Sequence, residues 1–189
     1  MYSYSMPIQT PICDFGQKAI PFELKSTENI VISLNDVKGD NGTLVMFICN
    51  HCPYVKALTK EIVEDCNELK KIGVNAVAIC SNDAASHPED SFENMIKFSK
   101  QNNFNFPYLV DDTQEIAKAY DAVCTPDFFG YNKNLELQYR GRLRGLKNLI
   151  PLKEGESDLL KAMKQIAATG EGPKQQIPSA GCGIKWKID

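Results

Sequence analysis

The sequence has little excess charge of either sign. Its 21 Lys and Arg residues are opposed by 24 Asp and Glu residues, which gives a formal net charge of -3. A chain without a broad basic field has little electrostatic attraction for nucleic acid or anionic lipid, so we expect no nucleic-acid partner. The one notable basic cluster is formed by Arg140, Arg142 and Arg144.

Long apolar runs and an export signal are also missing. No segment is long enough to span a membrane, and the first residues lack the basic and apolar regions of a secretory signal. The seven cysteines are an odd number without the spacing of a disulfide framework. We therefore expect a cytoplasmic protein without membrane contact, in which most thiols are reduced and pack as small hydrophobic groups.

The composition is that of an ordinary globular domain, with 43% apolar and 24% charged residues. At 189 residues, one decorated domain is expected over residues 1–189. Its core should cover about residues 20–170. Residues 171–189 show no helical or strand periodicity and are interpreted as a C-terminal tail.

The first half of this core reads as strand, helix, strand. Residues 43–49 form a continuous apolar run, which is typical of a strand buried on both faces. After Pro53, apolar residues recur at three- and four-residue spacing up to Gly73, which predicts an amphipathic helix. Residues 74–81 are a second apolar run, so the two strands should be parallel neighbours.

The rest of the chain adds further alternating elements. The patterns predict helices at about residues 91–102, 113–120 and 157–169, a short strand at 107–112, and an antiparallel pair joined at 132–134. An early strand pair at 22–24 and 30–34 provides an N-terminal β extension. This order predicts an α/β protein of the thioredoxin-like fold, with a central mixed sheet flanked by helices.

The segment CNHCPYVK, residues 49–56, lies where a buried strand meets a helix. Pro53 suits the first helical position, which makes Cys52 the N-cap. The unpaired N–H groups and the positive end of the helix dipole stabilise a thiolate there, so Cys52 is the candidate nucleophile. His51 would add positive charge or move a proton. The alternative is that Cys52 is an inert cap and His51 an ordinary loop residue.

A second motif is Thr125-Pro126 followed by DFFGY. It resembles the Thr-cisPro-x-Phe-Phe signature of thioredoxin-like proteins, in which the backbone approaches the reactive sulfur and pairs with a substrate chain. The alternative is a trans proline at the start of a strand.

The chain from about residue 21 to residue 186 resembles thioredoxin-family proteins related to the alkyl hydroperoxide reductase/thiol-specific antioxidant (AhpC/TSA, peroxiredoxin-like) group. The shared motifs are CNHCPYV, SND, HPEDS, TPDFF, YRG and GCxIKWK. The resemblance implies that Cys52 is the nucleophile and Pro126 the cis-proline. It also implies a thiol-disulfide oxidoreductase or a peroxiredoxin-like peroxidase, with antioxidant activity.

Two departures from better-known relatives affect this expectation. Peroxiredoxins carry Pro-x-x-x-Thr-x-x-Cys, but here Val45 takes the proline place and Cys49 the threonine place. Thioredoxins carry a second cysteine in the helix, where this chain has Val55. An arginine of the Arg140–Arg144 cluster would either approach the site from a neighbouring strand or lie in a solvated turn.

The partner thiol of Cys52 is left open between several cysteines. Cys49 gives a Cys-x-x-Cys motif shifted upstream of the helix and is the first candidate, with simple packing as its alternative. Cys182 would act if the tail folded back, although Ile184 and Trp186 suggest a tail that only docks. The other cysteines are predicted to pack in the core: Cys13, Cys66, Cys80 and Cys124.

Three functions compete. In the first, Cys52 attacks a disulfide or peroxide substrate, Cys49 resolves the product and a thiol reductant completes the cycle, without cofactor or metal. In the second, Cys49, Cys52 and either His51 or His87 bind or deliver a copper-type metal. In the third, the fold serves protein interaction without redox turnover. An N-terminal edge strand or the tail would allow a homodimer.

Overall fold

The computed structural model describes residues 6–188. Its largest sheet has seven strands in the order β3-β2-β6-β5-β4-β8-β9. The central strands β4, β5 and β6 are parallel, and the pairs on either side of them are antiparallel. The strands are β2 (Glu23–Ser26), β3 (Val31–Ser33), β4 (Gly42–Phe47), β5 (Val74–Cys80), β6 (Tyr108–Val110), β8 (Asp127–Tyr131) and β9 (Leu137–Tyr139). The predicted mixed sheet with its N-terminal β extension is confirmed.

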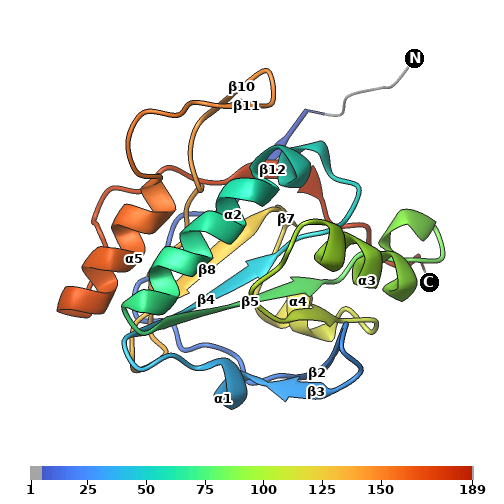
Figure 1. Cartoon of the computed structure of the whole chain (residues 1–189), viewed down its shortest axis with the longest axis horizontal. Helices are drawn as coiled ribbons and strands as arrows, with labels where there is room; N and C mark the ends of the chain where they lie inside the picture. Colours follow the sequence, from blue (N-terminus) through green and yellow to red (C-terminus); the bar gives the residue numbers. More distant parts are fainter. Residues whose placement is uncertain (1–5, 189) are drawn as a thin grey trace.

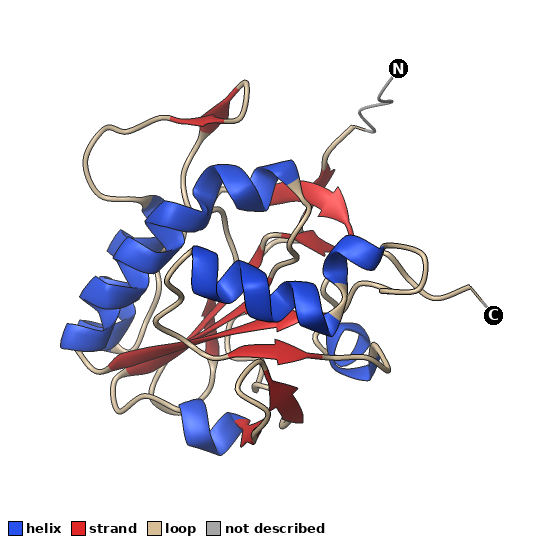
Figure 2. Cartoon of the chain, turned by 45° about the vertical axis from the view of Figure 1, so that its right-hand side comes forward, coloured by secondary structure: helices blue, strands red, loops and turns tan. Residues whose placement is uncertain are grey.

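Helices cover both faces of this sheet (Figures 1 and 2). Helices α2 (Pro53–Lys71) and α5 (Asp158–Thr169) pack on one face, where Leu44 and Met46 of β4 point. Helices α1 (Leu34–Val37) and α4 (Glu115–Ala119) lie on the other face, together with Val45 and Phe47 of β4. Successive strand residues point to opposite faces, so a strand covered on both sides is apolar throughout.

The helix boundaries follow the predicted signals. Helix α2 ends before Gly73, whose φ of +77° is accessible to glycine at little cost. The short helix η1 (Pro88–Asp90) leads into α3 (Phe92–Gln101), where the Ser91 hydroxyl accepts a hydrogen bond from the N–H of Asn94 at 3.2 Å. Within residues 6–188, no helix combines the length and apolar character needed to cross a membrane.

The C-terminal tail contains regular structure, which corrects the sequence prediction. Strand β12 (Ala180–Gly183) lies between β1 (Ile8–Gln9) and β7 (Cys124–Thr125), and both pairings are antiparallel. Small residues without alternation give β12 no periodic signal. They also permit its position, because a Cβ on Gly181 would lie 1.9 Å from the carbonyl oxygen of Thr125. A separate hairpin joins β10 (Leu146–Lys147) and β11 (Ile150–Pro151).

Candidate active site

Cys52 is the N-cap of α2, as predicted, and Pro53 is the first helical residue. The start of α2 lies near β12 in Figure 1, and the segment after β4 leads the chain to this point. Cys52 has 0% exposure to solvent. As a thiol, its Sγ–H donates to the carbonyl oxygen of Thr125, with a distance of 3.2 Å between Sγ and O.

The two sequence motifs meet at this point. The peptide bond between Thr125 and Pro126 is cis. The Thr125 hydroxyl lies 3.4 Å from the Sγ of Cys49, while its carbonyl faces Cys52. The structure therefore brings together four of the five predicted site residues, Cys49, Cys52, Thr125 and Pro126, although 73 residues separate Cys52 from Thr125 in the chain.

A third thiol belongs to the same cluster. In the antiparallel pairing of β12 with β7, Cys182 lies opposite Thr125, whose carbonyl faces the Cys52 sulfur, and its thiol lowers the pKa of Cys52. Cys182 is partly buried, whereas Cys49 and Cys52 are buried. The tail thus folds back over the site, and Cys49, Cys52 and Cys182 form one group.

The neighbours of Cys52 lower its pKa and thereby favour its thiolate. Hydrogen bonds from Cys182 and Cys49, together with the backbone N–H of Val55, hold the pKa of Cys52 well below its usual value despite its burial. The same hydrogen bonds to Cys52 raise the pKa of Cys49 and of Cys182. Of the three thiols, Cys52 is therefore the one whose thiolate is favoured, while deprotonation of Cys49 and Cys182 is disfavoured.

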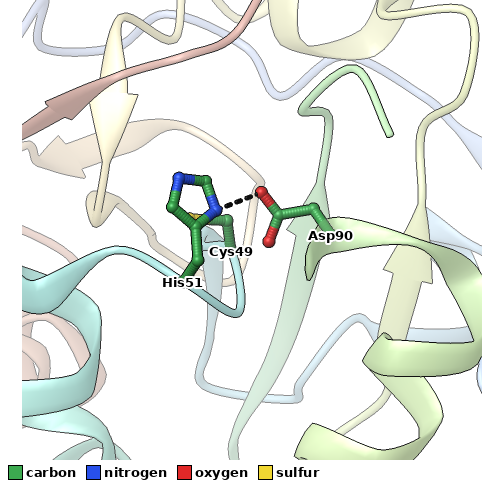
Figure 3. A group of neighbouring side chains, drawn as sticks. All are labelled: Cys49, His51 and Asp90. Atoms are coloured by element: carbon green, nitrogen blue, oxygen red, sulfur yellow. Dashed lines mark hydrogen bonds and ion pairs between the residues drawn. The ribbon is translucent and has the colours of Figure 1, made fainter. Parts of the chain in front are cut away.

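His51, the fifth predicted residue, points toward Asp90 (Figure 3). Its Nδ1 lies 2.6 Å from Oδ2 of Asp90. The hydrogen bond to Asp90 raises the pKa of His51 against the opposing effect of burial, and the charge of Cys52 adds to the rise. The ring of His87 stacks on that of His51, with 5.5 Å between their centroids.

Asp90 is buried and fully hydrogen-bonded. Its Oδ1 accepts from the backbone N–H of Asn50 at 2.8 Å, and its Oδ2 accepts from Nδ2 of Asn82 at 2.9 Å. Burial opposes ionisation of Asp90, but these bonds and that from His51 outweigh it and lower the pKa of Asp90. The side chain of Asn50 is held in turn by the hydroxyl of Tyr108 at 2.8 Å.

Sequence reasoning assigned no role to Asp90 and Asn82. Asp90 lies in the HPEDS motif and Asn82 in the SND motif, so both were noticed without a role. The sequence alone does not show that η1 places Asp90 next to His51, which lies 39 residues earlier in the chain. The available signal for Asp90 was its carboxylate, which lies between Pro88 and the helix cap Ser91.

Among the described residues, one group of three side chains has the spacing of a metal site. Ligand atoms of Cys49, His51 and Asp90 lie within 4.8 Å of one another. The group differs from the predicted set of Cys49, Cys52 and a histidine, because Cys52 is not part of it and Asp90 replaces it.

The expectation that the arginines of the Arg140–Arg144 cluster lie in a solvated turn is wrong. Arg140 and Arg144 are buried, and they pair with Asp127 and Glu61. Arg142 pairs with Asp158 at the start of α5. All three guanidinium groups are therefore engaged by carboxylates of the fold.

The remaining cysteines have no such stabilisation. Burial raises the pKa of Cys13 to about 11 and that of Cys80 to about 12, and it also raises the pKa of Cys66 and of Cys124. A thiol that stays protonated is a poor nucleophile. The contrast with Cys52 singles out one sulfur of the seven.

Comparisons with known proteins show the family and the fold. The model of the AhpC/TSA family matches residues 15–145. No curated protein matches the chain.

Several solved structures are similar. An uncharacterized conserved protein from Geobacillus kaustophilus has a TM-score of 0.89 and 41% identity, with 98% of each chain covered. A hypothetical protein from Sinorhizobium meliloti has a TM-score of 0.88 and 32% identity, covering 98% of this chain and 100% of that one. The thioredoxin domain of a thiol-disulfide oxidoreductase from Bacteroides vulgatus has a TM-score of 0.59 and 19% identity, covering 69% of this chain and 89% of that domain. This last likeness supports the thioredoxin-like fold.

Proposed function

This chain belongs to the AhpC/TSA family, and from that premise we propose that it is a thiol oxidoreductase whose Cys52 reduces small oxidised substrates. The observation that carries the proposal is the environment of the Cys52 sulfur. Two thiols and a backbone N–H converge on it at the start of α2 and stabilise its thiolate. The thiolate is the nucleophilic form of cysteine, and a lowered pKa keeps it populated at neutral pH.

The substrate would be a hydroperoxide or a low-molecular-weight disulfide. The thiolate of Cys52 attacks the substrate, giving a sulfenic acid and an alcohol from a hydroperoxide, or a mixed disulfide and a thiol from a disulfide. A neighbouring thiol then displaces water or the second thiol and forms a protein disulfide. An external thiol reductant restores both cysteines.

We propose a small substrate because a polypeptide has little access to Cys52. The side chain is fully buried, and β12 already pairs with β7 beside it. A protein substrate that extended this sheet would compete with β12 for the same backbone groups.

His51 would support the reaction as a positioning residue. Its raised pKa favours the imidazolium, whose charge lies near the thiolate of Cys52. Asp90 fixes the ring through Nδ1. The predicted proton-transfer role of His51 remains part of this proposal, and the partner thiol is one of the two candidates beside Cys52, Cys49 or Cys182.

The test is substrate consumption by the reduced protein with dithiothreitol as reductant. Hydrogen peroxide and oxidised glutathione are supplied separately to the native protein, Cys52→Ser and Cys66→Ser. We expect Cys52→Ser to fall to the uncatalysed rate with whichever substrate is consumed. Cys66→Ser is the matched control, because Cys66 is a buried thiol on the same helix. A Cys52→Ser protein as active as the native one, or a native protein that consumes neither substrate, would contradict the proposal.

A second candidate is metal binding by Cys49, His51 and Asp90, whose ligand atoms have suitable spacing. It has less support, because both oxygens of Asp90 already accept hydrogen bonds from within the protein. Copper(I) and zinc bound after dialysis would be measured by elemental analysis for the native protein, Cys49→Ser and Asp90→Asn. Stoichiometric metal that is lost in both variants would favour this candidate.

A further inference from the structure

We propose that Cys182 on strand β12 is the resolving thiol, which forms the disulfide with Cys52 after Cys52 has been oxidised. The inference rests on the proposed function of Cys52 and deepens it. It assigns a role to a strand that carries no periodic sequence signal, and it chooses between the two thiols that touch Cys52.

The position of Cys182 is fixed by backbone pairing. It lies opposite Thr125 in the register of β12 with β7, and the Thr125 carbonyl is the group that faces the Cys52 sulfur. Gly181 allows this approach, because any larger residue there would collide with the Thr125 carbonyl. The backbone pairing thereby brings Cys182 beside Cys52, where its thiol favours the Cys52 thiolate.

Contacts on both sides of β12 hold it in place. Ser179, just before the strand, donates its hydroxyl to the Pro126 carbonyl at 2.7 Å. After the strand, the backbone N–H of Lys185 donates to Oδ1 of Asn82 at 2.9 Å, and its carbonyl accepts from Gln114 at 2.9 Å. The thiol of Cys182 is therefore presented by an anchored strand and not by a loose end.

The surroundings of the two candidate thiols differ in what they do to a thiolate. Cys49 is buried, and the charge of Asp90 adds to the effects that oppose its deprotonation. The neighbouring Cys52 and burial raise the pKa of Cys182 as well, but Cys182 is partly exposed and the charge of Lys185 opposes that rise. A resolving thiol must lose its proton to attack, so partial exposure and the nearby cation favour Cys182 over Cys49.

Oxidation of Cys52 would itself activate Cys182. In the reduced protein, the main effect that raises the pKa of Cys182 is its hydrogen bond to Cys52. Conversion of the Cys52 thiolate into a neutral sulfenic acid removes the negative charge that accepts this hydrogen bond. The pKa of Cys182 then falls at the stage when its thiolate is needed.

The atoms and electrons balance as follows for a hydroperoxide substrate. The Cys52 thiolate takes the terminal oxygen, the O–O bond breaks, and the alkoxide leaves as an alcohol after taking a proton. The Cys182 sulfur attacks the Cys52 sulfur, an S–S bond forms, and the S–O bond breaks with release of water. The substrate has gained two electrons, and the two cysteines have lost them; a dithiol returns them.

The test maps disulfides by mass spectrometry after one equivalent of hydrogen peroxide, in the native protein, Cys182→Ser and Cys49→Ser. Dimedone, which labels sulfenic acids, is present in parallel samples. We expect a Cys52–Cys182 disulfide in the native protein and in Cys49→Ser. In Cys182→Ser we expect dimedone-labelled Cys52, with at least about a tenfold slower loss of the sulfenic acid. Far-UV circular dichroism and the thermal midpoint check that each variant is folded.

The outcomes separate this inference from the proposed function. A Cys49–Cys52 disulfide in the native protein, with Cys182 still reduced, would overturn the inference while leaving Cys52 as the nucleophile. The same follows if folded Cys182→Ser forms its disulfide at the native rate. A Cys52 that stays reduced in all three proteins would overturn the proposed function itself.

Discussion

At the scale of single residues, the chemistry depends on the charge held by the Cys52 sulfur. Two thiols, a backbone N–H and the start of α2 favour the thiolate, and burial opposes it. We expect the alkylation rate of Cys52 to change little between about pH 6 and pH 9. The rate of a free thiol, whose pKa is near 8.5, would instead increase about tenfold for each pH unit until the pH reaches that pKa. Iodoacetamide labelling followed by peptide mass spectrometry measures this for each cysteine.

Removing one donor should raise the pKa of Cys52. In Cys182→Ala the thiolate loses the hydrogen bond that contributes most to its stabilisation. At about pH 6 the labelling of Cys52 should then slow once its pKa exceeds 6, by at most about tenfold for each further unit of pKa. Cys124→Ala is the control, since Cys124 is buried nearby and donates to the carbonyl of Pro126 instead. A steep pH dependence already present in the native protein would refute the thiolate assignment.

The His51–Asp90 pair makes a second prediction at this scale. Replacement of Asp90 by Asn removes the main cause of the raised pKa of His51, so that pKa should decrease. Proton NMR titration of His51 measures the change. The variant should also lose about 1–3 kcal/mol of unfolding free energy, because buried donors from Asn50 and Asn82 lose a charged acceptor.

The pH dependence of that loss has a defined sign. The pKa of His51 is raised, so its contribution is complete below the ordinary histidine value of 6.5 and is lost as pH rises through the higher folded value. The pKa of Asp90 is lowered, so its contribution is complete above 3.8 and is lost as pH falls through the lower folded value. The destabilisation by Asp90→Asn should therefore be largest between these two values. An equal loss in Asp40→Asn, where the carboxylate is exposed, would contradict it.

At the scale of elements, we expect β12, which pairs with β7 beside Cys52, to limit access to the site. Gln114 anchors the segment after β12 by donating to the Lys185 carbonyl and accepting from the N–H of Lys187, both at 2.9 Å. We expect Gln114→Ala to let β12 open more often, since about two hydrogen bonds of about 1 kcal/mol each are lost. Cys52 should then react about tenfold faster with a bulky maleimide, with little change for hydrogen peroxide.

The matched control for this prediction is Gln165→Ala. Gln165 also donates to a backbone carbonyl, that of Glu171, but it lies on the exposed side of α5. Equal acceleration of the bulky and the small reagent would mean that β12 does not limit access to Cys52.

A buried ion pair between Arg140 and Asp127 connects β8 with the end of β9. Replacing Arg140 tests how much this pair contributes to the stability of the sheet. Arg140, just after β9, donates to Asp127 of β8 at 2.9 Å and packs over the ring of Phe129. Arg140→Met should cost about 3–5 kcal/mol of unfolding free energy, because the carboxylate of Asp127 is left buried without its partner. Chemical denaturation measures the loss. The double variant with Asp127→Leu should recover part of it; further loss would contradict the explanation.

At the scale of the whole molecule, the two possible disulfides differ in how much chain they enclose. A bridge from Cys52 to Cys182 closes a loop of roughly 130 residues, whereas a bridge from Cys49 to Cys52 closes a loop of about four. The chain-entropy model gives about 5 kcal/mol of stabilisation for the long loop and about 2 kcal/mol for the short one. Oxidation should therefore raise the thermal midpoint markedly in the native protein and in Cys49→Ser.

Calorimetry of the reduced and oxidised proteins measures this difference. Cys182→Ser provides the comparison, because it retains only the short loop as an alternative. A similar rise in midpoint for Cys182→Ser and the native protein would exclude the long loop.

The sequence by itself determined the central layers of the fold and the position of the Cys52 sulfur at the start of a helix. Runs such as residues 43–49 specify strands buried on both faces, and the spacing after Pro53 specifies α2, because these patterns depend on neighbours a few residues apart. The position of Cys52 at the helix start follows from Pro53 for the same local reason.

Only the tertiary structure decided what surrounds that sulfur. The contacts of Cys52 with Thr125 and Cys182 join segments far apart in the chain, and so does the pairing of His51 with Asp90. Strand β12 exists because β7 and β1 supply hydrogen-bonding edges on both sides of it. Its small residues carry no periodic pattern, and backbone pairing over such distances is a property of the folded chain, so no local signal revealed it.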